Sequence, residues 1–176
     1  MKTLKNIFCG FLFLTLSLFS VSQNAQVTKL ENPISVAYLK KHLSKKSPQL
    51  ILTPAIEKKI KLKLKSDVSV QKYFVFLKKQ ADSILKKPLL KREMEGFRLL
   101  AVSRDMIERM GILSMVYRLN KNDEILNRIN DELIAVCDFS DWNPKHFLDV
   151  AEMSFAVAIA IDWTGEFLPK TTVQLA

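Results

Sequence analysis

Apolar residues recur at steps of three and four positions along most of the chain after Pro33, which is the spacing that places side chains on one face of an α-helix. The clearest stripe consists of Val70, Phe74, Leu77, Ala81, Ile84 and Leu85. Apolar and polar residues do not alternate over a strand's length in this part, and the chain has four glycines. The pattern therefore predicts an all-α fold.

Helix-start and helix-stop residues divide the first part of this region into two helices. Thr53 followed by Pro54 is typical of an N-cap and the first helical position. Ser66 or Asp67 is expected to cap the next helix, which Pro88 ends.

Two further helices are predicted to form an antiparallel hairpin. The third helix is expected to start with Ser103 as its cap and to run through Leu119. Residues 120–122 form a turn, and Asp123 and Glu124 occupy the first turn of the fourth helix, where carboxylates favour the helix dipole. Such a short connection forces the two helices to lie antiparallel.

The stretch "FSDWNPKHFLDVAEMSFAVAIAIDW", residues 139–163, runs from a polar, aromatic loop into an almost wholly apolar helix. Asn143 is expected to cap this helix, with Pro144 at the first helical position. No charge occurs from Met153 to Ile161, so neighbouring helices are expected to enclose that segment. The predicted architecture is a series of antiparallel helical hairpins around a buried inner helix.

The amino terminus is predicted to be a targeting segment. Lys2 and Lys5 precede an apolar run over residues 7–21 that is short for a bilayer span and is followed by polar residues. We expect a signal peptide over residues 1–22, with cleavage before Gln23 or, alternatively, before Gln26. A lead segment over 23–46 and a helical domain over 47–176 follow, and the exported chain is expected to be periplasmic or secreted, with no membrane span after cleavage.

Composition limits the chemistry of the exported chain. Removal of residues 1–22 also removes Cys9 and leaves Cys137, whose apolar neighbours favour an inert core residue and exclude an internal disulfide. The two histidines, His42 and His146, lie far apart, and no Cys or His pair has the spacing of metal ligands. The sequence therefore predicts neither a metal nor a cofactor.

Charge is distributed unevenly along the chain. Residues 40–92 hold sixteen Lys or Arg against three acids, whereas residues 93–176 hold eight against fourteen. The basic half either collects an anionic polymer or is simply a solvated, lysine-rich surface. No DNA- or RNA-binding motif accompanies the charge, so nucleic acid is not the expected partner.

Several segments resemble, in the right order, the amino-terminal region of heparinase II/III-like polysaccharide lyases. They are "SPQLILTP", "LLKREMEGFRLLAVSRDMIERM" and "YRLNKNDEILNRINDELIAVCDFSDWNPKHFLDVAEM", and the resemblance covers residues 47 to about 175. Two departures stand out, because Ser47 replaces a usual histidine and "DWTGEF" replaces a usual Asp-Trp-Leu-Tyr pattern.

The resemblance implies part of an α/α toroid that the complete family member packs against β-sheet domains. It also implies cleavage of uronate-containing glycans, heparin-like, heparan-like or alginate-like, by β-elimination. That reaction requires a group that neutralises the carboxylate, a base and an acid, and the resemblance places these in later helices and sheet domains. We therefore expect the amino-terminal part of an exported lyase that is inactive alone, with the catalytic residues beyond residue 176. The alternatives are a non-catalytic module that binds acidic polysaccharide and a nonfunctional remnant.

Three residues of the loop at 139–146 are the candidate substrate-binding residues. Trp142 can stack on a pyranose ring or close the core, and Asn143 can face the cleft or cap the helix. His146 can contact an acidic sugar, or it can be a structural histidine paired with Asp141 or Asp149.

Three nearby acids are candidates for chemistry. Glu152 is expected to pair with Lys145 or an arginine of a neighbouring helix rather than to act as a base. Asp141 and Asp149 fit a glycosidase acid pair poorly, because no partner constellation accompanies them.

Overall fold

The computed structural model describes residues 34–43 and 47–176, and all regular structure in these residues is helical. The predicted all-α fold is therefore confirmed, whereas the predicted signal peptide lies outside the described residues. The chain divides into two units, Met1–Leu43 and Ser44–Ala176. In the first unit, α2 (Val36–His42) is capped by the Ser35 hydroxyl, which accepts from the Tyr38 amide at 3.0 Å.

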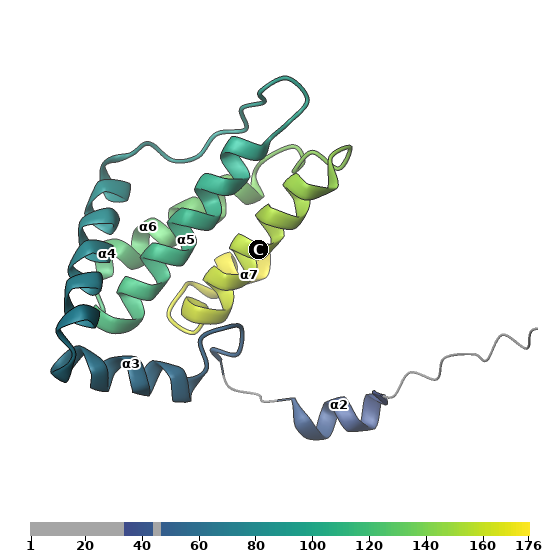
Figure 1. The fold of residues 1–176 in the computed structure, drawn as a ribbon. Helices are drawn as coiled ribbons and strands as arrows, with labels where there is room; N and C mark the ends of the chain where they lie inside the picture. Colours follow the sequence, from purple (N-terminus) through teal and green to yellow (C-terminus); the bar gives the residue numbers. More distant parts are fainter. Residues whose placement is uncertain (1–33, 44–46) are drawn as a thin grey trace, which may run out of the picture. The chain divides into compact units, whose positions relative to one another are not determined.

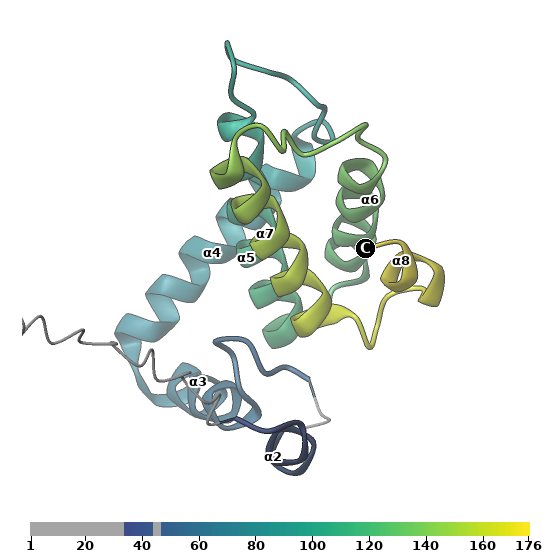
Figure 2. The same ribbon diagram turned by 90° about the vertical axis from the view of Figure 1, so that its right-hand side faces the viewer.

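The second unit contains six helices among its described residues. They are α3 (Pro54–Ser66), α4 (Val68–Lys86), α5 (Leu100–Asn120), α6 (Asp123–Cys137), α7 (Phe147–Thr164) and α8 (Lys170–Leu175). The long helix α5 is central, because it packs against α7, α6 and α4 (Figure 1). The short helix α8 lies beside α6 (Figure 2).

Local caps start three of these helices where the sequence predicts. The Thr53 hydroxyl accepts from the Ile56 amide at 3.3 Å, and the Asp67 carboxylate accepts from the Ser69 and Val70 amides. The Asn122 side chain caps α6 in the same way, with 2.8 Å to the Glu124 amide. The two residues between α5 and α6 produce the predicted hairpin.

The predicted start of α5 is wrong. This helix begins at Leu100, and Ser103 lies inside its first turn, where its hydroxyl donates to the Leu100 carbonyl and to Glu152. Leu99 occupies the cap position without a side-chain cap of its own, and its amide donates at 2.7 Å to the distant carboxylate of Asp149.

The predicted start of α7 is also wrong. The helix begins at Phe147, and residues 143–146 form a turn in which the His146 amide donates to the Asn143 carbonyl at 2.8 Å. Asn143 has a φ of 58°, a left-handed conformation that asparagine tolerates better than most residues. Its side-chain amide donates to the Phe97 carbonyl and to the Asp149 carboxylate, and it does not cap the helix.

The core is the predicted set of helical stripes. Met106, Met110, Leu113, Ile129, Leu133, Val136 and Met153 are among its fully buried members. Cys137 lies partly buried against this core, and burial raises the pKa of its thiol, as expected of an inert residue.

The inner helix α7 is less enclosed than predicted. Met153, Ala156 and Ala160 are buried against α5, but Ala151 and Phe155 on the outer face are exposed. The absence of charge from Met153 to Ile161 therefore does not mean that every face of the segment is covered.

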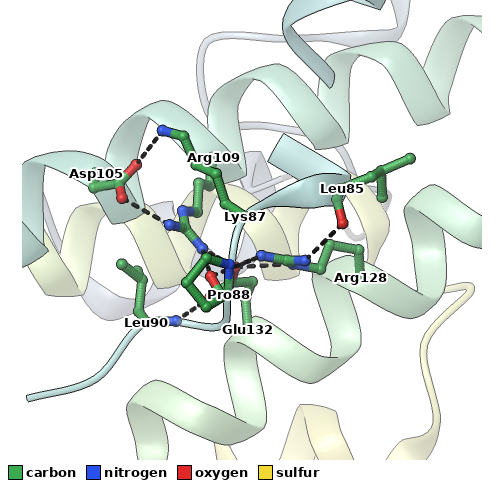
Figure 3. Close-up of polar contacts among 8 residues, drawn as sticks. All are labelled: Leu85, Lys87, Pro88, Leu90, Asp105, Arg109, Arg128 and Glu132. Atoms are coloured by element: carbon green, nitrogen blue, oxygen red, sulfur yellow. Dashed lines mark hydrogen bonds and ion pairs between the residues drawn. The ribbon is translucent and has the colours of Figure 1, made fainter. Parts of the chain in front are cut away.

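A buried ion network holds the start of the connection between α4 and α5 (Figure 3). The fully buried carboxylate of Glu132 binds the guanidinium groups of Arg109 and Arg128 and accepts from the Leu90 amide at 3.1 Å. Both arginines also donate to the Pro88 carbonyl. The charges thus satisfy one another, which is the condition under which buried ions are tolerated.

A second network fastens α3 and the segment before it to the rest of the unit. Arg118 of α5 binds Glu57 of α3 and donates to Glu166 at 2.7 Å. The backbone amides of Gln49 and Leu50 both donate to the Asp162 carboxylate, at 2.7 and 2.8 Å. Residues 49–52 are therefore an anchored coil.

No helix of the described residues is long and apolar enough to cross a membrane.

Candidate functional site

The connections α4–α5 and α6–α7 lie at the same end of the second unit (Figures 1 and 2). The fully buried carboxylate of Asp149 joins them. Its Oδ2 accepts from the Leu99 amide and from the Asn143 side-chain amide, both at 2.7 Å, and its Oδ1 accepts from Arg98 at 3.2 Å. Burial alone would raise the pKa of Asp149, but these hydrogen bonds outweigh it and hold the pKa below its ordinary value.

A tight turn before α5 presents an aromatic ring to solvent. Glu95 and Arg98 exchange two backbone hydrogen bonds, and Gly96 between them has a φ of 59°, which glycine adopts without strain. The next residue, Phe97, is 91% exposed. Single exposed apolar residues are common, but a ring this exposed at the tip of a two-residue turn is available to a ligand.

Asn143 is buried and fixes the turn from the other side. Its side-chain amide donates to the Phe97 carbonyl at 2.9 Å as well as to Asp149, and its backbone amide donates to Asp141 at 2.7 Å. The side chain therefore positions the two connections relative to each other. Its role as a direct substrate contact stays a prediction.

Trp142 lies partly buried against the core. Its Nε1 donates to the Val136 carbonyl at the end of α6, at 2.8 Å. The indole thus closes the core beneath the loop, one of the two roles expected for it, while stacking on a sugar stays a prediction.

His146 is the sequence-predicted site residue that has a buried ring nitrogen without a hydrogen-bond partner. Its Nδ1 lies 3.5 Å from Oδ1 of Asp149, an ion-pair distance without hydrogen-bond geometry, and its ring is about one third exposed. Lys145 is exposed beside it, and Phe147 at the start of α7 is 81% exposed. We call Phe97, Arg98, Lys145, His146 and Phe147 the rim.

The rim combines positive charge with exposed rings. Arg98 and His146 approach the same carboxylate oxygen of Asp149, so the guanidinium and the imidazole lie close together. Sequence reasoning missed Phe97, Arg98 and Phe147 as site residues. The glycine of "EGFR" was the available signal, because it marks a turn that exposes the following side chain.

The acids near the rim have structural partners. Asp141 pairs with Arg92 at 2.7 Å, while Glu152 accepts from Ser103 at 2.7 Å and pairs with Arg104 of α5 at 3.4 Å. The predicted pairing of Glu152 with an arginine of a neighbouring helix is confirmed.

Residues 93–176 hold one tyrosine, Tyr117. Tyr117 is buried in the core, where burial raises the pKa of its phenol. No group of three or more His, Cys, Asp or Glu in the described ranges could hold a metal ion.

A hollow of about 420 Å³ lies beside the same connection, between its residues and the start of α5. Its charged lining is mixed, with Lys91 and Arg109 against Glu93, Glu95 and Asp105. The Nε of Arg109 is buried there without a hydrogen-bond partner, whereas Oδ1 of Asp105 forms an ion pair with Lys87 at 3.5 Å. The hollow therefore lacks the net positive charge that would favour an acidic ligand.

No family model matches the sequence, and comparison with curated proteins finds no match either.

Proposed function

We propose that residues 47–176 form the amino-terminal helical part of an exported polysaccharide lyase, and that the rim contacts its uronate-containing glycan. The observation that supports this proposal is the combination of cations and exposed rings at the rim. Lys145, His146 and Arg98 can neutralise carboxylate or sulfate groups, while Phe97 and Phe147 offer flat apolar faces to pyranose rings.

In this proposal the rim binds and orients the glycan, and other parts of the enzyme perform the chemistry. β-Elimination needs a base and an acid within hydrogen-bond reach of one sugar. The unsatisfied Nδ1 of His146 is buried, and Tyr117 is buried as well. The base and acid are proposed to belong to later helices of an α/α toroid and to β-sheet domains.

Binding to defined oligosaccharides tests the role of the rim. Phe97→Ala is expected to weaken the affinity for heparin and alginate oligosaccharides about five- to tenfold, because one ring face is lost. Lys145→Ala is expected to weaken it about two- to fivefold at low salt, because an exposed cation is screened by water and ions. Titration calorimetry measures both.

Matched controls are Phe155→Ala and Lys170→Ala, which remove an exposed ring and an exposed cation outside the rim. Equal losses in the controls and in the rim variants would refute the assignment of the rim.

The DNA beyond the codon for Ala176 tests the enzyme part of the proposal. We expect it to encode further toroid helices and a β-sheet domain, in frame or after a frameshift or stop. Unrelated sequence in all frames would contradict the lyase proposal and leave the rim result standing.

A module that binds acidic polysaccharide without chemistry is the second candidate. The burial of Tyr117 favours it, because this is the one tyrosine of residues 93–176 and the rim itself contains none. Binding should fall steeply as salt rises, and retention on heparin that does not change with salt would exclude it.

A further inference from the structure

The outer face of α4 carries an alternation of valine and lysine that the rim does not explain. Val68, Lys72, Val75 and Lys79 follow at steps of four, three and four residues, so they share one face of the helix. Val68 is 62% exposed and Val75 is 48% exposed. The opposite face of α4 packs into the core through Ala81 and Ile84. On the outer face, Val75 and Lys79 border a hollow of about 240 Å³ whose far side is formed by the end of α5 and the start of α6.

The lysines of this face are uncommitted. Lys72 and Lys79 are exposed and make no hydrogen bond or ion pair with another described residue. The same holds for Lys58 and Lys65 of α3, which flank the exposed Leu62 and line with it a shallow hollow of about 250 Å³. The two helices together carry nine lysines, whereas Glu57, their one buried acid, is occupied by Arg118 and Lys61.

The aromatic ring of Phe76 lies at the edge of this face and is 52% exposed. The ring of Tyr73 lies near it, with 6.3 Å between the ring centroids, on the side of α4 away from Val75. Amphipathic aromatic rings of this kind favour the boundary between headgroups and acyl chains.

Solvation alone does not account for this composition. Valine is a poorer helix former than lysine or glutamate, so exposed valines stabilise neither the helix nor the core. An acidic glycan would satisfy the lysines, but it offers little to aliphatic side chains such as Leu62 and Val75. A phospholipid bilayer with anionic headgroups offers negative charge to the lysines and, just below the headgroups, an apolar region to the aliphatic side chains.

We propose that the outer face of α3 and α4 binds the surface of an anionic phospholipid bilayer. The lysines contact headgroup phosphates, while Leu62, Val68, Val75 and Phe76 enter the interface between headgroups and acyl chains. This site is separate from the rim and does not depend on the proposed lyase function.

Co-sedimentation with vesicles tests the proposal, using the exported form of the chain without residues 1–22. The protein is expected to bind phosphatidylcholine vesicles that contain phosphatidylglycerol and to bind pure phosphatidylcholine vesicles at least tenfold more weakly. Lys72→Glu with Lys79→Glu should weaken binding to the anionic vesicles at least tenfold, and Val68→Ser with Val75→Ser about three- to tenfold. All four positions are exposed, and a thermal melt checks that each variant is folded.

Lys170→Glu reverses an exposed charge on α8 and should leave vesicle binding unchanged, while binding of all these variants to acidic oligosaccharides should stay as in the native chain. Loss of vesicle binding with the lysine variant but not with the valine variant would overturn the bilayer proposal and indicate a polyanion contact. Equal binding to both kinds of vesicle, or to neither, would also overturn it.

Discussion

The carboxylate of Asp149 holds together two connections that lie about 50 residues apart in the sequence. It takes hydrogen bonds from a backbone amide, an asparagine and an arginine, and the imidazole of His146 approaches it. If the carboxylate is removed, its buried donors are left without an acceptor. The free energy lost in this way is larger than the net contribution of the hydrogen bonds to stability. The position of the rim therefore depends on one residue behind it.

Asp149→Asn should lower the free energy of unfolding by about 2 to 4 kcal/mol, because an amide replaces two acceptor oxygens and sets a donor against donors. Urea denaturation of the variant measures the loss. Asp82→Asn on the exposed face of α4 is the control and should change stability by less than about 0.5 kcal/mol. A similar small change for Asp149→Asn would mean that the buried carboxylate does not hold the loops.

At the scale of single elements, the sequence predicts a helix well where its cap is local. Thr53, Asp67 and Asn122 each accept from amides two or three residues ahead, so the cap and the helix are visible in one short stretch. Helix α5 has no such cap, because its first turn is fixed by Asp149 of another helix. The prediction that Asn143 caps α7 is wrong for the same reason, because its side-chain amide binds the Phe97 carbonyl and Asp149 instead.

The rim was only partly predictable. His146 and Trp142 stood out as rare residue types, whereas the exposure of Phe97 follows from a turn whose stability depends on the loop opposite. Glu132 pairs with Arg128, which lies four residues earlier on the same helix, and with Arg109 of α5. The spacing in the sequence predicts the pair with Arg128 but not the pair with Arg109. The spacing of apolar residues predicts which face of a helix is buried. It does not predict which polar group from a distant part of the sequence binds there.

Asn122→Ala should destabilise the second unit by about 1 kcal/mol, because the Glu124 and Ile125 amides lose their acceptor. Asn127→Ala, in the middle of the same helix and exposed, removes the same side chain without removing a cap and should be neutral or slightly stabilising. Chemical denaturation compares the two. Equal effects would show that the cap bond contributes nothing.

At the scale of the whole unit, ion networks hold the connections while apolar stripes hold the helices. Glu132 fixes the start of the α4–α5 connection, Asp149 fixes its end, and Glu57 with Arg118 fixes α3. Burial opposes the charged form of Glu57, Asp105 and Asp149, but hydrogen bonds and nearby cations lower the pKa of all three. The acids are thus more acidic in the folded chain than in the unfolded one.

Stability should therefore be lost on the acid side. A carboxylate with a lowered pKa contributes its full stabilisation above its unfolded pKa, near 4, and loses it as the pH falls towards the folded pKa. We expect a free energy of unfolding that is level from about pH 5 to 7 and that falls below about pH 4.5. Urea titrations at a series of pH values measure this, and the fall should be shallower in Asp149→Asn. An increase in stability on acidification would contradict the sign of these shifts.

The 176-residue chain alone should show no lyase turnover on heparin, heparan sulfate or alginate. The rim supplies cations, but Tyr117 is enclosed in the core and cannot reach a sugar. Formation of an unsaturated uronate, followed by its ultraviolet absorbance, provides the assay. Turnover by the native chain that disappears in His146→Ala would overturn this expectation and make His146 a catalytic residue.

The attachment of residues 49 and 50 to Asp162 has a consequence for the order of events during protein synthesis. The partners are 113 and 112 residues apart, so a ribosome adding about 5 to 20 residues per second makes the acceptor roughly 6 to 22 s after the donors. During that interval Leu52 lacks Ile159 and Trp163, the apolar neighbours that bury it in the finished unit. The start of the second unit is thus made early but is among the last of its parts to be buried, so Leu52 stays without these apolar neighbours until α7 has been synthesised.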